Sequence, residues 1–191
     1  MPWEKSFDVE QALDRAKEVF LTKGYEGTSM ADLLEATGLN KGSLYNAFGS
    51  KKELFNKALL RYEQEERKAN LRELEALDQP VTAIKRVFDD MVEPSVPLKG
   101  CLLINTALDL PNHDAEVEAT VKAGIKDLEA FFTRQLELAQ SRREVSRKLN
   151  VPRVAGGLTA LVVAIRVLER GALNRPGLML IRDQAAALLE Q

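Results

Sequence analysis

Helical periodicity runs through this chain and constrains its fold more than any other feature. Apolar residues recur at spacings of three and four, while the strict alternation typical of β-strands is scarce. Gly, Pro, Asn and Asp interrupt the pattern where helices are expected to end. The pattern predicts an all-α fold of about nine helices, with three small helices first and a bundle after them.

Four helices are predicted before the pattern changes. Gly24, Gly38 and Gly49 are of the residue type that commonly follows a helix end. Ser29 and Ser50 each stand three positions before an acidic residue, which is a helix-capping pattern. The predicted ranges are 8–23, 29–37, 41–48 and 50–77, followed after Pro80 by 81–92, 100–110, a helix of about 25 residues after Asp114, 152–173 and a last helix from 176.

Composition excludes several classes of protein. Lys and Arg number 27 against 29 Asp and Glu, so the whole-molecule charge of -2 does not by itself predict nucleic-acid binding. A single Cys excludes an intrachain disulfide, and a single His leaves little for zinc binding or His-based catalysis. No Gly-rich loop follows a strand and no nucleophile elbow is present, so we expect no catalytic residues, no metal and no cofactor.

Nothing in the pattern indicates a membrane protein. The longest uncharged run, Val154 to Ile165, has 12 residues and is too short to cross a bilayer as a helix. The first residues contain no apolar stretch of the kind found in secretory signals. We therefore expect a cytoplasmic protein without a membrane partner.

The most informative segment is residues 28–54, where two short predicted helices are joined by Gly38-Leu39-Asn40. This length and turn chemistry are typical of a helix-turn-helix. Six apolar residues have the spacing of a small core: Met30, Leu33, Leu34, Leu39, Leu44 and Phe48. The remaining positions of the second helix would face outward: Lys41, Gly42, Ser43, Tyr45, Asn46 and Ala47. Such a face, with short donors, one ring and one amide, suits the major groove of DNA.

Local charge supports this interpretation. Between Lys41 and Arg61 there are five basic residues and one acidic residue, whereas residues 1–60 as a whole carry a net charge of -1. The helix starts at Ser29 and Ser50 also expose backbone N–H groups that can bind phosphate. An alternative stays open, because short helices with Gly turns occur in many helical proteins and Lys51-Lys52 can be an ordinary solvated helix start.

The segment 28–55, TSMADLLEATGLNKGSLYNAFGSKKELF, resembles the DNA-binding signature of the TetR family of transcriptional regulators. The preceding FLTKGYEG is similar to the end of that family's first helix, and the likeness covers about residues 12–62. Beyond it, only overall length and helix count match. The resemblance implies a DNA-binding domain over residues 1–50 and a ligand-binding and dimerisation domain over residues 51–191. It also implies a homodimer that represses at a palindromic double-stranded operator and leaves when a small-molecule effector binds.

The resemblance also implies roles for particular residues. Expected DNA contacts are phosphate binding by Thr28, Ser29 and Lys52, groove entry by Lys41, Gly42 and Ser43, and contacts to backbone or bases by Tyr45 with Asn46 beside it. Ala47 departs from the family, which often has His or Tyr there, and a methyl group donates no hydrogen bond. A competing hypothesis is therefore a helical small-molecule-binding protein without operator recognition, which the sequence pI of 5.7 also favours. Trp3 and Lys5 are candidates for a DNA-touching arm, although a mobile terminus is the commoner case.

The last two helices are predicted to form the dimer interface. The helix from Pro152 is apolar on more than one face and needs two partners. The expected interface residues are Leu158, Leu161, Val162, Ile165, Leu168, Leu178, Ile181 and Leu188. Burial within one subunit is the alternative. A dimer would set two recognition helices about 34–36 Å apart, one turn of DNA.

Cys101 is a possible effector-sensing residue. It follows Lys99-Gly100 near a predicted helix start, where a positive charge and a helix N-terminus favour a thiolate. Gly-Cys-Leu at this place also resembles a subset of the family in which a cysteine reacts with electrophiles or oxidants. The alternative, a small buried hydrophobic side chain, is the commoner state of a free cysteine.

Overall fold

Helices form all the regular structure of the described residues, which are 8–95, 98 and 100–190 in the computed structural model. The helices are α1 (Val9–Lys23), α2 (Met30–Thr37), α3 (Lys41–Phe48), α4 (Lys51–Arg61), α5 (Lys68–Ala76), α6 (Pro80–Val92), α7 (Leu102–Ala107), α8 (Ala115–Ser141), α9 (Val151–Leu168) and α10 (Arg175–Ala187). A π-helical segment, Tyr62–Arg67, joins α4 to α5, so that these three form one continuous rod. With that rod counted once, the described residues contain nine α-helices, as predicted. Trp3 and Lys5 lie outside the described residues.

Local caps, including the predicted ones at Ser29, Ser50 and Gly38, explain where the first helices begin and end. Asp8, Ser29, Asn40 and Ser50 each accept a hydrogen bond from a backbone N–H of the following turn. Gly38 ends α2 in the left-handed conformation, with φ of 71°. Because each cap satisfies donors or acceptors of its own helix end, these boundaries follow from local sequence.

Two later helices are shorter than predicted. The segment expected at 100–110 is α-helical only over α7, which starts late because Gly100 has φ of 80° and Cys101 is extended. The helix expected at 152–173 ends at Leu168, and Gly171 with φ of 118° redirects the chain before Asn174 caps α10. Glycine readily adopts a positive φ, which an α-helix does not contain. A glycine in this conformation therefore limits the helix even where the apolar pattern continues.

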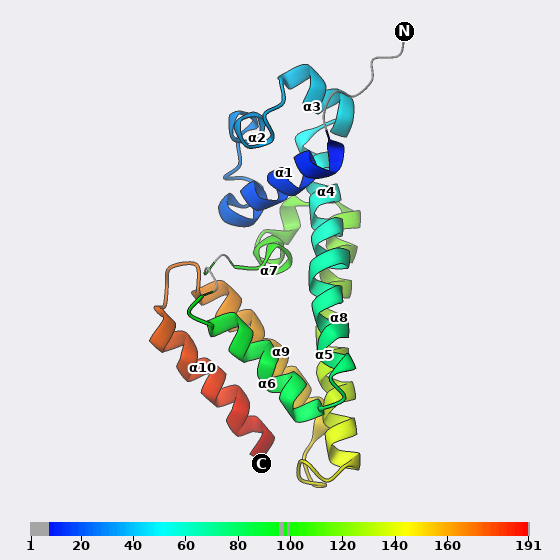
Figure 1. Ribbon diagram of the computed structural model, residues 1–191, viewed down its shortest axis with the longest axis vertical. Helices are drawn as coiled ribbons and strands as arrows, with labels where there is room; N and C mark the ends of the chain where they lie inside the picture. The colour runs from blue at the N-terminus through cyan, green and yellow to red at the C-terminus, as the bar shows by residue number, and fades with distance from the viewer. Residues whose placement is uncertain (1–7, 96–97, 99, 191) are drawn as a thin grey trace.

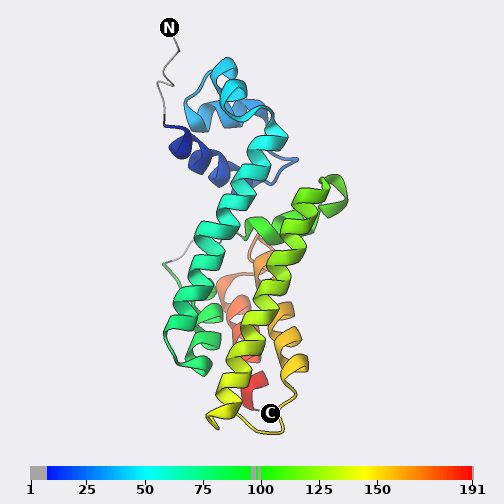
Figure 2. The same ribbon diagram turned by 90° about the vertical axis from the view of Figure 1, so that its right-hand side faces the viewer.

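Figure 1 shows the three small helices as a unit at one end of an elongated body, with the C-terminus at the other end. Figure 2 shows that the α4–α5 rod and α8 run side by side along the length of that body. The N-terminal unit has a core of its own around Phe20, Leu33, Leu44 and Phe55. That core continues into α7 and the start of α8, so the unit is packed onto the body rather than tethered to it.

The second core lies among α6, α8, α9 and α10, and it corrects part of the predicted dimer interface. Leu158, Ile165 and Leu178 are fully covered by their own chain, and Val162 is 7% exposed. Within a single chain these four side chains pack inside the core formed by α6, α8, α9 and α10, and they leave almost no surface for a partner to cover. The other four predicted interface residues, Leu161, Leu168, Ile181 and Leu188, remain half-buried.

By length and composition alone, α9 is apolar enough to cross a membrane, a test that core helices of soluble proteins also pass. In this fold it contacts α7, α8 and α10. Its apolar composition is explained by one face buried in this core and a second face that its own chain leaves partly uncovered.

Candidate nucleic-acid interface

The orientation of α3 follows from the core of the N-terminal unit. Leu44 and Phe48 are buried against α1 and α4, and Leu33 anchors α2 in the same cluster. The glycine turn at Gly38 then sets α3 across α2. The opposite side of α3 therefore faces outward at the end of the molecule remote from the C-terminus (Figure 1).

Four of the six α3 residues that the sequence predicts to face outward are exposed in the structure. Lys41, Gly42, Tyr45 and Asn46 are exposed, and the Lys41 ammonium lies 5.9 Å from the centroid of the Tyr45 ring. Gly42 adds no side chain, so the backbone at the start of α3 can approach a surface closely. This face offers a cation, an aromatic hydroxyl and an amide without any rearrangement of the core.

Two expected groove residues are less exposed. Ser43 is half-buried, and its backbone N–H donates to the Asn40 side chain at 2.8 Å. Ala47 is half-buried as well and packs against the core beneath α3. The methyl group at position 47 thus contributes to packing, which the spacing alone did not indicate.

Thr28 and Ser29, which were both expected to bind phosphate at the start of α2, differ in their exposure. Ser29 is exposed and forms a reciprocal capping box with Asp32. Thr28 is 1% exposed, and its hydroxyl donates to the Gly24 carbonyl oxygen at 2.6 Å. That hydroxyl closes the turn between α1 and α2, so in this conformation it has no proton to offer a phosphate.

Asp32 is held as a carboxylate at this helix start. Lys23 donates to it at 2.6 Å, and the backbone N–H and the hydroxyl of Ser29 donate to its other oxygen. These donors, Lys23 first, keep the pKa of Asp32 well below its usual range. An acidic side chain therefore stands beside the exposed backbone N–H groups of α2.

Lys52 lies at the start of α4, where Ser50 caps the helix. Its ammonium is 3.1 Å from Asp114 Oδ2, and its side chain is 56% exposed. Asp114 is the N-cap of α8, and the Asn56 amide donates to the same carboxylate at 3.1 Å. Lys52, which was expected to bind phosphate, is thus paired with Asp114 in the C-terminal body. The two residues are 62 positions apart, so no local sequence pattern revealed this contact.

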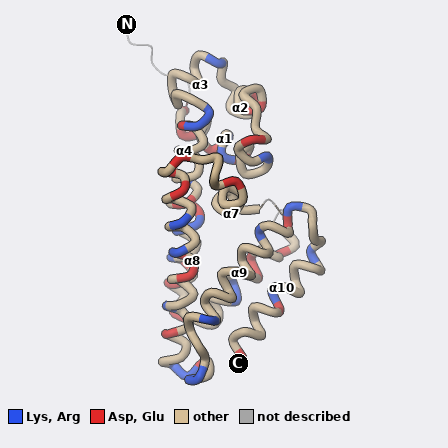
Figure 3. The backbone as a smooth tube through the Cα atoms, turned by 180° about the vertical axis from the view of Figure 1, so that it is seen from behind, with Lys and Arg blue, Asp and Glu red and all other residues tan. Residues whose placement is uncertain are grey.

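Basic residues gather around α3. Figure 3 shows Lys and Arg segments flanking α3 at its end of the molecule, whereas basic and acidic segments alternate along α8.

The Lys51 ammonium lies 4.3 Å from the centroid of the Tyr25 ring, and Tyr25 in turn packs on Phe55 and His113. The only histidine therefore belongs to an aromatic junction between the N-terminal unit and the body. Among the described residues no group of three or more His, Cys, Asp or Glu could hold a metal ion.

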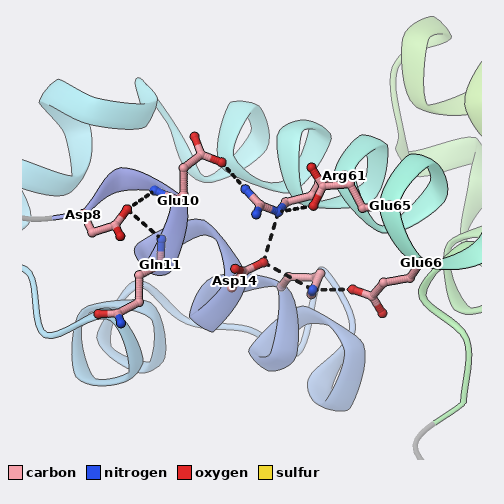
Figure 4. Close-up of polar contacts among 8 residues, drawn as sticks. Asp8, Glu10, Gln11, Asp14, Arg61, Glu65 and Glu66 are labelled. Carbon is pink, nitrogen blue, oxygen red and sulfur yellow. Dashed lines mark hydrogen bonds and ion pairs between the residues drawn. The ribbon is translucent and has the colours of Figure 1, made fainter. Parts of the chain in front are cut away.

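An ionic cluster between α1 and the α4–α5 rod was missed by sequence reasoning (Figure 4). Arg61 pairs with Glu10, Asp14 and Glu65. Lys17, whose side chain is 11% exposed, pairs with Asp14 and Glu66. Burial lowers the pKa of Lys17, but the two carboxylates outweigh it and leave the pKa above its usual value. The cluster fixes α1 to the π-helical segment. Only the spacings within one helix, Asp14–Lys17 and Arg61–Glu65, were visible in the sequence.

A cavity of about 310 Å³ opens in the body behind that π-helical segment. Its walls come from the rod and from α6, α7, α8 and α9, and they include Tyr62, Glu66, Arg67, Met91, Cys101, Leu103, Ile125, Leu128 and Arg166. Cys101 is 6% exposed and precedes α7 as its N-cap, and the Tyr62 hydroxyl donates to its sulfur at 3.4 Å. Lys99, expected to act on this thiol, lies outside the described residues.

Family models match both parts of the chain. The model described as "Bacterial regulatory proteins, tetR family" matches residues 12–58. The model described as "Tetracyclin repressor-like, C-terminal domain" matches residues 79–171. The first range contains the whole of α2 and α3, and the second contains most of the cavity walls.

Relatives and solved structures agree with these models. The chain is 36% identical to the uncharacterized HTH-type transcriptional regulator YezE of Bacillus subtilis over 146 residues, 74% of this chain and 75% of YezE. It is 30% identical over 185 residues to the HTH-type transcriptional repressor ComR of Escherichia coli, 93% of this chain and 86% of ComR. A cysteine mutant of the TetR-family regulator CifR, solved with 26-bp operator DNA, is similar with a TM-score of 0.77 and 25% identity, over 95% of this chain and 97% of that one. The reduced form of Escherichia coli NemR shares the fold, with a TM-score of 0.81 at 16% identity, over 96% of this chain and 97% of that one.

Proposed function

Because the chain belongs to the TetR family of transcriptional regulators, we propose that it represses transcription as a homodimer on a palindromic operator and is released by a small-molecule effector. It is a regulator and not an enzyme. The observation that carries the proposal is the exposed face of α3, which is free of core contacts and flanked by the capped starts of α2 and α4. We also propose that it acts in the cytoplasm, where its DNA lies.

The proposed contacts follow from exposure and donor chemistry. Lys41, Gly42 and Ser43 enter the major groove at the start of α3, and Tyr45 with Asn46 contacts backbone or bases. Ser29 and Lys52 bind phosphates on either side of the groove, at two helix N-termini. Ser29 is exposed, so its hydroxyl can exchange the hydrogen bond that it donates to Asp32 for one to a phosphate. Thr28 supports this set by closing the turn before Ser29, since its own hydroxyl is buried and bonded.

A homodimer through α9 and α10 is supported by the apolar surface that remains there. Six large hydrophobic side chains are exposed among the described residues, and three of them, Leu173, Met179 and Leu180, lie on α10 or the turn before it. Leu161, Leu168, Ile181 and Leu188 extend this surface as half-buried neighbours. Covering such a surface with a second copy would remove it from water and set two α3 helices at matching half-sites.

Effector response is supported by the cavity and by its position. Tyr62, Glu66 and Arg67 line it from the π-helical segment, which continues directly from α4. A molecule that binds better to one position of α4 than to another would change the distance between recognition helices. Cys101 enters this proposal as a wall residue of the cavity.

Operator titration tests the proposal. The full-length protein is titrated against the promoter region of its own gene, by gel shift or anisotropy. Wild type is expected to bind with an affinity that falls steeply with salt, because phosphate contacts release counterions. The double variant Tyr45→Ala/Lys52→Ala is expected to lose at least about tenfold in affinity. The control variant Lys126→Ala, at an exposed position of α8, is expected to retain wild-type affinity. Unchanged affinity in the double variant, or a flat salt response, would favour the competing hypothesis of a ligand-binding protein without operator recognition.

A further inference from the structure

The cavity is large enough for one small molecule and its wall is mainly apolar. At about 310 Å³ it has the volume of roughly ten liquid water molecules, which leaves room for a molecule of up to about fifteen non-hydrogen atoms. Met91, Leu103, Ile125 and Leu128 supply much of the surface. The few polar groups in the wall therefore decide which molecules of this size are accepted.

The charged residues of the wall are already neutralised. Each has an opposite charge next to it: Arg67 with Glu63, Arg166 with Glu169 at 3.0 Å, Glu66 with Lys17, and Asp90 with Arg86 at 3.9 Å. Glu63 and Glu169 are 3% and 4% exposed, so the first two pairs are well shielded from water. An ion entering the cavity would lose its hydration without gaining an unpaired counter-charge. The wall thus favours an uncharged molecule.

One buried donor in the wall lacks a strong acceptor. Among the described residues the Tyr62 hydroxyl has one hydrogen-bond partner, the Cys101 sulfur at 3.4 Å, and sulfur is a weak acceptor. Burial, with the nearby Cys101 next, raises the pKa of Tyr62 well above its usual value, so the hydroxyl keeps its proton. An oxygen acceptor placed beside Tyr62 would replace a weak hydrogen bond with an ordinary one.

We propose that the effector is an uncharged, mostly apolar molecule of up to about fifteen non-hydrogen atoms whose carbonyl-type oxygen accepts a hydrogen bond from Tyr62. This inference rests on the proposed function, because it takes the cavity as the effector site. Tyr62 is the first residue of the π-helical segment, so a molecule held by its hydroxyl bears directly on the continuation of α4.

Matched probes test this recognition. Acetophenone and ethylbenzene have similar size and shape but differ in the acceptor oxygen, while benzoate and 2-phenylethylammonium carry a negative and a positive charge. Binding of each to the full-length protein is measured by calorimetry or ligand-observed NMR. Wild type is expected to bind acetophenone about 3- to 10-fold more tightly than ethylbenzene, the value of one neutral hydrogen bond, and more tightly than either ion.

The variant Tyr62→Phe removes only the hydroxyl. It is expected to bind both neutral probes equally, with the affinity that wild type shows for ethylbenzene. Equal binding of the two neutral probes by wild type, no detectable binding of either, tighter binding of an ion, or a preference that survives in Tyr62→Phe would each overturn the inference. The wild-type comparison decides the question even if the variant fails to fold.

Operator titration on the same samples separates this inference from the proposed function. Operator binding without selectivity for acetophenone would reject the inference and leave the regulator intact. Selectivity for acetophenone without operator binding would reject the proposed function and leave the ligand class standing.

Discussion

The pairing of Lys52 with Asp114 yields a prediction about operator affinity. Lys52 must face a phosphate if it clamps DNA, yet its ammonium lies 3.1 Å from Asp114 Oδ2. Asp114→Asn removes the competing charge and preserves the α8 cap, because Asn caps helices about as well as Asp. The Val117 N–H that donates to Asp114 Oδ1 at 3.0 Å keeps its acceptor in the variant.

The size of the effect follows from exposure. The side chains of Lys52 and Asp114 are 56% and 26% exposed, so water and salt screen their attraction. Ion pairs with this exposure change an equilibrium by about 1.4- to 5-fold. We therefore expect Asp114→Asn to bind the operator about 1.4- to 5-fold more tightly than wild type at about 0.15 M salt, and the gain to shrink as salt rises.

A double-mutant cycle assigns the gain to Lys52. Affinities of wild type, Asp114→Asn, Lys52→Ala and the double variant are measured by anisotropy on the same operator fragment. The gain from Asp114→Asn is expected to vanish when Lys52 is alanine. Glu118→Gln, one turn further along α8, serves as the matched charge control and should change affinity less than about 1.5-fold. If Asp114→Asn weakens binding, or if its gain persists without Lys52, the competition between Asp114 and phosphate is refuted.

Three further predictions concern stability, assembly and sensing. Gly124→Ala is expected to lower the free energy of unfolding by about 1–3 kcal/mol in chemical denaturation, because the added Cβ would overlap Leu103 Cδ1 and lie 3.1 Å from Glu63 Oε2. An unchanged denaturation midpoint would contradict this packing. Leu180→Glu is expected to give monomers in sedimentation at micromolar concentration, whereas the equally exposed Leu108→Glu stays dimeric, and a dimeric Leu180→Glu would exclude the α10 surface. If Cys101 senses electrophiles, Cys101→Ser represses normally and resists release by quinones or hypochlorite; release equal to wild type would leave Cys101 as a buried wall residue.

The pH dependence of stability gives one more test of Asp114, with Asp114→Asn as the comparison. Its pKa is lowered in the fold, first by the Val117 N–H and then by Asn56 and Lys52, so the unfolded chain binds more protons near the ordinary pKa of about 3.9. The carboxylate thus contributes stability above pH 4 and loses it as the pH falls toward the folded pKa. In thermal melts, the advantage of wild type over Asp114→Asn should be constant from pH 7 to 5 and fade below pH 4; an advantage that grows on acidification would contradict the sign.

Most of the recognition helix could be predicted because its determinants are local. Ser29, Asn40 and Gly38 satisfy or redirect backbone groups within four residues of themselves, so the boundaries of α2 and α3 follow from short-range sequence. The periodicity of α3 likewise separates buried Leu44 from exposed Tyr45 without any knowledge of the rest of the chain. The all-α class rests on the same short-range regularity.

The contacts between elements that are distant in the sequence were decided only by the tertiary structure. An apolar stripe states that a helix face is buried but not what covers it, which is why Leu158 and Leu178 belong to the core of one subunit and not to its surface. The pairings of Lys52 with Asp114 and of Lys17 with Glu66 join residues 62 and 49 positions apart. Charge alone does not select such partners, because many Asp and Glu residues are equally available until packing brings one of them within reach.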